Sequence, residues 1–122
     1  MGVTQSESRI MEALWARGPL SADEIEAEVA EPQGWGAATV RTLIHRLMKR
    51  EAIASERAKG RVRYRPVLQK SDYLQQESQS LLDRLFDGRL APLVAHFATH
   101  RTLSPEEIKQ LRVLLEELDD DR

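Results

Sequence analysis

The sequence predicts a mainly helical fold interrupted by one β-hairpin, and three observations support this prediction. Residues 37–50 place apolar side chains at positions 40, 43, 44, 47 and 48, which form one stripe on one helix. Residues 53–67 alternate at period two on both sides of a Lys59-Gly60 turn, as a hairpin does. Further amphipathic segments precede and follow this pair. The 122 residues are enough for one ordinary domain or two small ones.

The helix predicted over residues 37–50 has a second face that is polar and free of carboxylates. This face presents Thr42, His45 and Lys49, with Arg41 and Arg46 beside them. Threonine and arginine side chains of this kind reach base edges and phosphates in duplex DNA. A solvated surface helix would show the same pattern. The segment that follows distinguishes a DNA-binding helix from a solvated one.

The hairpin after this helix is basic on one side. Its second strand, predicted over residues 61–67, puts Val62 and Tyr64 on one face and arginines on the other. The arginines of that face are Arg61, Arg63 and Arg65. Like charges in a row repel each other unless they meet an anion, and a phosphate backbone is the usual anion. A polar helix followed by a basic hairpin is typical of a winged helix-turn-helix.

Charge is distributed unevenly along the chain, although the formal net charge is only −2. Half of the 18 lysines and arginines lie between positions 41 and 65, where only Glu51 and Glu56 oppose them. Residues 1–40 instead hold seven acidic side chains against Arg9 and Arg17. A local basic patch on an acidic protein restricts anion binding to one face.

Cap and turn signals mark the remaining N-terminal helices. The first is predicted from Gln5 to Arg17, with Thr4 and Glu7 as a capping box and Gly18-Pro19 as its stop. The second opens with a Ser21-x-x-Glu24 capping box and runs to about Ala30, where the sequence Glu-Pro-Gln-Gly at 31–34 breaks it. Gly36 or Ala37 is expected to cap the third helix without a strong side-chain bond, which leaves amides for a phosphate or for water.

Three leucine-rich helices are predicted after the hairpin, over about 71–86, 91–100 and 105–118. We expect a boundary after residue 70, with a DNA-binding domain over 1–70 and a helical dimerisation domain over 71–122. About fifty residues are too few for an independent core, so a second copy of the chain is the simplest partner for the apolar stripes. Folding back onto the winged helix is the alternative. The expected interface residues are Leu74, Leu81, Leu82, Leu85, Leu93, Val94, Phe97, Ile108, Leu111, Leu115 and Leu118.

The helix sequence ATVRTLIHRLMKREAI at 38–53 resembles the recognition helix of the penicillinase-repressor (BlaI/MecI) family, and the surrounding motifs keep that family's order. These motifs are LW at 14–15, LSADEI at 20–25, Trp35, LF-x-G at 85–88, LVAHFA at 93–98 and LSPEEIKQLRVLL at 103–115. The resemblance implies a homodimeric winged-helix repressor that binds double-stranded, dyad-symmetric operator DNA. It also implies control of β-lactamase or other resistance or stress genes, and relief by cleavage through a membrane sensor-protease pathway.

The resemblance also implies roles for individual residues. Thr39, Arg41 and Thr42 match the family's T-x-R-T contact cluster. Ala38 and Gly36 stand where the family often has lysine and serine. The family's cleavage point is typically an Asn-Phe bond, and His96-Phe97 stands in its place. The expected DNA-binding set is Thr39, Arg41, Thr42, His45, Arg46, Lys49, Arg61, Arg63 and Arg65.

Other functions remain as alternatives. His96 and His100 are four residues apart on one predicted helix, which is a spacing used by metal sites, but no third ligand is evident. No arrangement typical of catalysis stands out, so neither an enzyme nor a cofactor is expected. A winged helix can also bind RNA or protein. The absence of cysteine, of a signal-peptide pattern and of a long apolar run favours a cytoplasmic protein.

Overall fold

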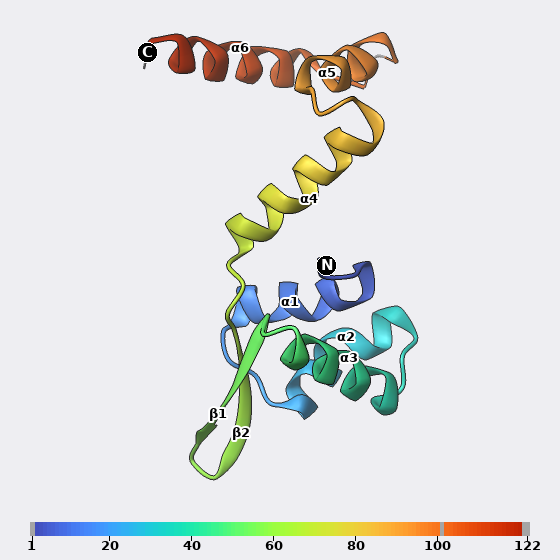
Figure 1. Ribbon diagram of the computed structural model, residues 1–122, viewed down its shortest axis with the longest axis vertical. Helices are drawn as coiled ribbons and strands as arrows, with labels where there is room; N and C mark the ends of the chain where they lie inside the picture. The colour runs from blue at the N-terminus through green and yellow to red at the C-terminus, as the bar shows by residue number, and fades with distance from the viewer. Residues whose placement is uncertain (1, 101, 121–122) are drawn as a thin grey trace. The chain divides into compact units, whose positions relative to one another are not determined.

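The computed structural model describes residues 2–100 and 102–120. Its elements follow the order α1, α2, α3, β1, β2, α4, α5, α6 (Figure 1). The N-terminal elements are α1 Gln5–Arg17, α2 Ala22–Gln33, α3 Ala37–Lys49, β1 Ile53–Ala58 and β2 Arg61–Pro66. The C-terminal helices are α4 Lys70–Leu85, α5 Leu90–Thr99 and α6 Pro105–Asp120. Two compact units, Met1–Gln76 and Glu77–Arg122, divide the chain within α4.

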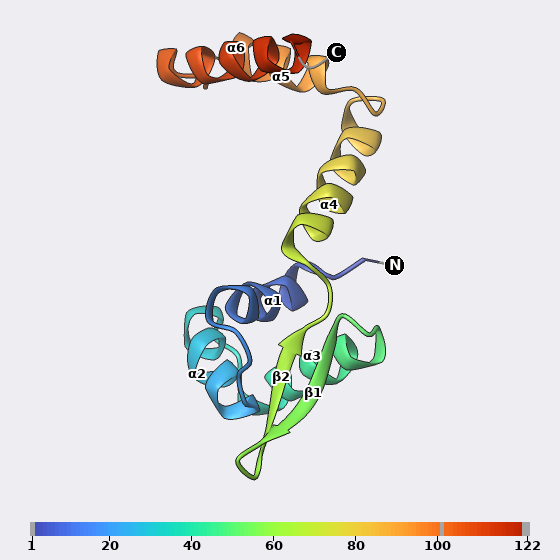
Figure 2. The same ribbon diagram turned by 90° about the vertical axis from the view of Figure 1, so that its left-hand side faces the viewer.

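The first unit is a three-helix core closed by the hairpin, as Figure 2 shows for α1, α2, α3 and the two strands. The apolar stripe predicted for α3 is buried, with Met48 packed at its edge. Side chains from α1, α2 and β1 complete the same core. Its fully or nearly fully buried members are Ile10, Met11, Leu14, Leu20, Ile25, Val29, Ala30, Val40, Leu43, Ile44, Leu47, Ala52 and Ile53. The predicted fold class, a winged helix followed by three helices, is confirmed.

The hairpin is antiparallel and pairs Ala58 with Arg61 next to the turn and Ile53 with Pro66 at its base. Its outer edge is not free, because Tyr64 exchanges two backbone hydrogen bonds with Leu20 in the loop between α1 and α2. The Tyr64 amide donates to the Leu20 carbonyl at 2.7 Å, and the Leu20 amide donates back at 3.0 Å. β2 therefore has backbone partners on both sides, which fixes the hairpin to the helical core.

Side-chain caps begin three of the helices, although one predicted capping box is only half formed. Ser21 and Glu24 make the full reciprocal box at α2. Ser104 accepts from the Glu107 amide at 3.2 Å at the start of α6. Thr4 accepts from the Glu7 amide at α1, but the Glu7 side chain does not return to Thr4. That part of the prediction was wrong because the Glu7 carboxylate has a stronger, charged partner elsewhere.

The predicted end of α2 at Ala30 was also wrong, because the helix continues through Pro32 to Gln33. Proline removes a single backbone donor, and here its ring lies on the exposed side of the last turn. Gly34 ends the helix in the left-handed region at φ 70°, where its amide donates to the carbonyls of Ala30 and Glu31. Glycine adopts this conformation at no steric cost, so it is the true stop signal. Other boundaries differ from the predictions by two residues or fewer.

The C-terminal helices lack a buried side chain in the part of the chain that the structure describes. Half-buried leucines lie next to exposed ones, and Leu85 and Leu118 are 63% and 65% exposed. Four more residues of the predicted interface are exposed: Leu74, Phe97, Ile108 and Leu115. Within residues 2–100 and 102–120, no helix combines the length and the apolar character that crossing a membrane requires.

Candidate nucleic-acid interface

A groove runs between α3, the hairpin and the first turn of α2, with a volume of about 890 Å³. Arg41, His45 and Lys49 line it from successive turns of α3, and Arg61 lines it from β2. Asp23 is the carboxylate among its lining residues. A concave surface with cations on two walls attracts an extended anion, because the charges act together over a short distance.

The predicted contact residues of α3 all lie on its exposed face. These residues are Thr39, Arg41, Thr42, His45, Arg46 and Lys49. The Thr42 hydroxyl donates to the Ala38 carbonyl at 2.9 Å, which holds the side chain in one rotamer. Gly36 caps the helix without a side-chain hydrogen bond. The start of α3 therefore presents backbone amides and small polar groups, while its middle and end present cations.

The three arginines of β2 do not share one environment. Arg61 and Arg65 are exposed, as predicted for phosphate contacts. Arg63 is half-buried, and its Nη2 donates to the carbonyl of Pro19 at 2.9 Å. This bond ties β2 to the loop between α1 and α2, next to the Leu20–Tyr64 bridge. The guanidinium of Arg63 therefore already has a partner within the fold. The alternation of the sequence had instead suggested one shared role for all three arginines.

Arg63 and Arg17 also influence Glu24, the acidic member of the α2 capping box. Hydrogen bonds from the backbone and side chain of Ser21 lower the pKa of Glu24, and the positive charges of Arg63 and Arg17 lower it further. The hairpin is therefore hydrogen-bonded to the loop that precedes α2, at Pro19 and Leu20, and Arg63 acts on Glu24 through its charge. Ser21, which caps α2, and Arg61 of β2 line the same groove.

One polar contact of the first unit was missed from the sequence. Glu7 is fully buried, and its Oε2 lies 2.8 Å from Nη1 of Arg50 at the end of α3. The signal was present, because Glu7 shares the helical stripe of Ile10, Met11 and Leu14. The sequence alone does not identify Arg50 as the partner of Glu7. A glutamate in the first turn of a helix is then more simply explained as part of a cap.

The histidine pair of the metal hypothesis lies on α5. The ring centroids of His96 and His100 are 4.4 Å apart, and Nδ1 of His100 is 2.9 Å from the His96 carbonyl. Among the described residues, no group of three or more histidine, cysteine or acidic side chains could hold a metal ion. The two tilted rings therefore have no third histidine, cysteine or acidic ligand among the described residues.

The fold matches solved winged-helix structures. It is similar to the solution structure of the DNA-binding domain of the repressor BlaI, with a TM-score of 0.52 and 24% identity, covering 58% of this chain and 87% of that chain. It is also similar to the solution structure of monomeric Bacillus licheniformis BlaI in complex with the blaP half-operator. There the TM-score is 0.55 and the identity 23%, covering 60% of this chain and 89% of that chain. The protein is of the winged-helix class.

Sequence comparison then identifies the family. The penicillinase repressor family profile matches residues 3–117. The penicillinase repressor of Bacillus licheniformis is 32% identical over 116 residues, covering 94% of this chain and 90% of that protein. The methicillin resistance regulatory protein MecI of Staphylococcus aureus (strain N315) is 28% identical over 113 residues, covering 93% and 92%. The chain belongs to the penicillinase repressor family, which consists of transcriptional repressors with a DNA-binding winged helix rather than enzymes.

Proposed function

We propose that this protein is a dimeric repressor that binds a palindromic operator in double-stranded DNA through α3 and the wing. The exposed polar face of α3 enters the major groove, and the wing contacts the neighbouring phosphate backbone. Thr39, Arg41 and Thr42 read bases or nearby phosphates, while His45, Arg46 and Lys49 extend the contact along α3. Arg61 and Arg65 are the phosphate contacts of the wing, and Arg63 contributes mainly by holding the wing in place.

The observation that carries this proposal is the groove between α3 and the hairpin. Cations from two separate elements, Arg41 and Lys49 on α3 and Arg61 on β2, line one concave surface. A DNA strand has the charge and the shape to fit there, because its phosphates follow one another along a curved path. A solved complex of Bacillus licheniformis BlaI with a half-operator has a similar fold, which supports DNA as the partner.

Dimerisation is proposed through α4, α5 and α6. Leucine and phenylalanine side chains on these helices remain exposed, and none of their described residues is buried. Such a surface is stable in water when a second apolar surface covers it. We assign residues 1–70 to DNA binding and residues 71–122 to dimerisation. Trp15 supports the start of α4, since its ring centroid lies 5.4 Å from that of Tyr73.

Relief of repression is proposed to follow cleavage between His96 and Phe97, which lie within α5. Both side chains are exposed, but the Phe97 carbonyl accepts hydrogen bonds from the amide and the hydroxyl of Thr102, each at 3.0 Å. A protease therefore requires local opening of α5 before it can act. A cut there would separate α6 from the rest of the dimer region. A membrane sensor-protease pathway is the proposed source of the cut, and genes for β-lactamase or other resistance or stress functions are the proposed targets.

A binding assay separates DNA from RNA and from protein partners. Fluorescence anisotropy would compare a fluorescent duplex DNA library, a duplex RNA of matched length and a single-stranded RNA at several salt concentrations. The proposal expects preferential binding to duplex DNA, with an affinity that falls as salt rises. Equal or tighter binding to RNA would favour an RNA-binding winged helix. A lack of binding to every nucleic acid would favour a protein partner.

A further inference from the structure

The carboxylate of Glu7 is an unusual component of the core. Its side chain is fully buried on the face of α1 that otherwise carries Ile10, Met11 and Leu14. An ionised carboxylate in an apolar environment is strongly unfavourable unless it is paired and hydrogen-bonded. A glutamate at this position therefore needs a cationic hydrogen-bond partner. The element that supplies this partner indicates which parts of the fold the glutamate holds together.

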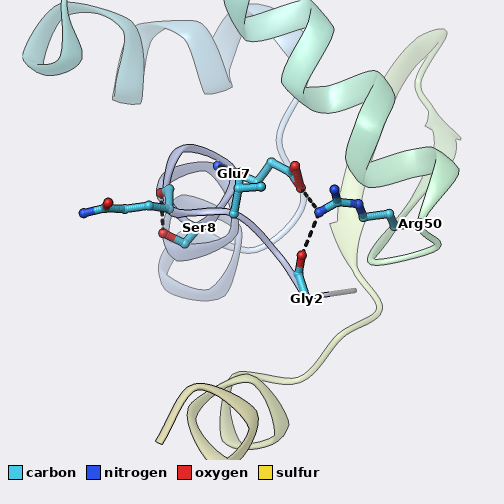
Figure 3. Close-up of polar contacts among 6 residues, drawn as sticks. Gly2, Glu7, Ser8 and Arg50 are labelled. Carbon is cyan, nitrogen blue, oxygen red and sulfur yellow. Dashed lines mark hydrogen bonds and ion pairs between the residues drawn. The ribbon is translucent and has the colours of Figure 1, made fainter. Parts of the chain in front are cut away.

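The partner is Arg50, the residue that caps the C-terminal end of α3. Nη1 of Arg50 donates to Oε2 of Glu7 at 2.8 Å and to the carbonyl of Gly2 at 2.8 Å, as Figure 3 shows. The Arg50 side chain is 31% exposed, whereas Glu7 is covered completely. Oε1 of Glu7 has no hydrogen-bond partner among the described residues. One ion pair thus joins the first turn of α1, the N-terminal segment and the end of α3.

The end of α3 is conformationally strained immediately after Arg50. Glu51 has φ 62°, in the left-handed region that helices usually reserve for glycine. Its amide donates to the Met48 carbonyl at 3.0 Å, and the Ala52 amide donates to the Leu47 carbonyl at 3.0 Å. These two bonds form a Schellman motif without its glycine. A strained backbone of this kind persists when surrounding contacts determine it independently.

The same junction carries the base of the wing. The Ala52 carbonyl accepts from the amides of Val67 and Leu68, at 2.8 and 3.0 Å, where the chain leaves β2. Ile53, the first residue of β1, is buried in the core. The position of residues 50–53 therefore sets where the hairpin starts relative to α3, and so sets the width of the groove between them.

We propose that Glu7 is a positioning residue of the DNA-binding surface. Through Arg50 it holds the strained α3–β1 junction and fixes the relative placement of the recognition helix and the wing. Glu7 lies inside the fold, so it acts on DNA only through Arg50. This inference rests on the proposed function, because it concerns how well two walls of one groove match a DNA duplex.

The test compares Glu7→Gln with Glu28→Gln in the full-length chain. Glu28 pairs with Arg17 on the exposed surface of α1 and α2, so its substitution is a matched control. At a temperature where every variant is folded, Glu7→Gln should lower the ratio of operator to non-operator affinity by about tenfold, the size expected for the loss of one good base contact. The salt slope should stay unchanged, because no phosphate contact is removed. Glu28→Gln should leave both quantities at their wild-type values.

A second substitution tests the junction itself. Glycine at position 51 adopts the left-handed conformation without strain, so Glu51→Gly should restore most of the specificity of Glu7→Gln. If Glu7→Gln fails to fold, the double variant Glu7→Leu/Arg50→Met takes its place, since it removes the buried charge together with its partner. It should show the same loss and the same rescue. An unchanged affinity ratio, or a loss that Glu51→Gly does not reverse, would overturn the proposal.

Amide hydrogen exchange separates this inference from the function on which it rests. Without DNA, Glu7→Gln should accelerate exchange at Glu51 and Ala52 while the amides of the Leu20–Tyr64 bridge keep their wild-type rates. Wild-type exchange at the junction would refute the positioning role even if the protein binds DNA. If the wild-type chain binds no duplex, the proposed function fails, and with it the DNA part of this inference, whereas accelerated exchange would still support the junction contact.

Discussion

Arg61 and Arg63 lie two positions apart on one strand, but their surroundings differ, and we expect different roles for them. Arg61 is exposed at the edge of the groove, and Arg63 donates to the Pro19 carbonyl inside the first unit. A guanidinium that is free in solution can meet a phosphate without losing an existing bond. A guanidinium that already has a protein acceptor has to give up that bond or share its remaining donors.

Replacing each arginine by alanine should therefore have different effects. Arg61→Ala should lower affinity for all DNA sequences and reduce the salt slope by about one unit, with little change in the unfolding free energy. Arg63→Ala should reduce the unfolding free energy by about 1 kcal/mol, the usual contribution of one hydrogen bond, and weaken DNA binding through a looser wing. Anisotropy titrations in a salt series, paired with urea unfolding, measure both quantities. Identical behaviour of the two variants would contradict this assignment.

Arg41 is the residue for which direct readout is easiest to test. It is exposed on α3 and lines the groove, away from the apolar stripe. Arg41→Ala should weaken operator binding by about 1–3 kcal/mol, the contribution of one good contact, and leave the unfolding free energy nearly unchanged. Arg9→Ala on α1 is the control, because Arg9 is exposed and does not line the groove. An unaltered operator affinity for Arg41→Ala would rule out its role in readout.

At the scale of the element, the α2 capping box gives a pH dependence whose sign follows from Glu24. Its pKa is lowered in the folded chain by the hydrogen bonds of Ser21, so the carboxylate stabilises the fold above its ordinary pKa of 4.5. That contribution is lost as the pH falls through the lowered folded value. Glu24→Gln should therefore show a flatter dependence of the unfolding free energy on pH as the pH falls below 4.5. Denaturation midpoints of the wild type and of Glu24→Gln, measured across this range, test the prediction. Parallel curves of midpoint against pH would contradict a contribution of Glu24 to the pH dependence.

Local sequence signals were sufficient to predict most elements. The stripe of α3, the Lys59-Gly60 turn and the cap at Ser21 each act within a few residues, and all are present in the structure. The end of α2 was mispredicted because Pro32 was given more weight than Gly34. In the last turn, a proline costs one hydrogen bond, whereas a left-handed glycine reverses the chain.

Contacts between distant residues could not be predicted in the same way. Glu7 and Arg50 are 43 positions apart, and the Arg63–Pro19 bond spans 44. Each requires the helices and the hairpin to be packed first, so no local pattern distinguishes these side chains from solvated ones. The exposed cations of α3 were easier to predict, because a helical period alone separates them from the buried stripe. Their contact with DNA remains a prediction.

At the scale of the whole molecule, the proposed operator binding depends on two binding modules acting together. A dimer places two reading helices on one duplex, and the second contact then forms at a high effective concentration. Residues 1–89 lack α5 and α6, which carry most of the proposed dimer interface. This fragment should therefore be monomeric. The winged helix should remain at least partly folded, because its core comes from α1, α2, α3 and β1. Operator binding should weaken strongly. Sedimentation velocity and anisotropy measure these outcomes, and a stable dimer with full affinity would refute the proposed interface and the proposed switch.

Selection of bound duplexes from a random DNA pool by the full-length protein tests the central claim most directly. A two-fold symmetric dimer with one reading helix in each subunit predicts enrichment of an inverted repeat, with half-sites centred about one helical turn, or 10 base pairs, or a multiple of it apart. The Arg41→Ala variant should enrich the repeat less strongly. Enrichment of a single unrepeated site, or no enrichment at all, would contradict a dimeric repressor that reads DNA through α3.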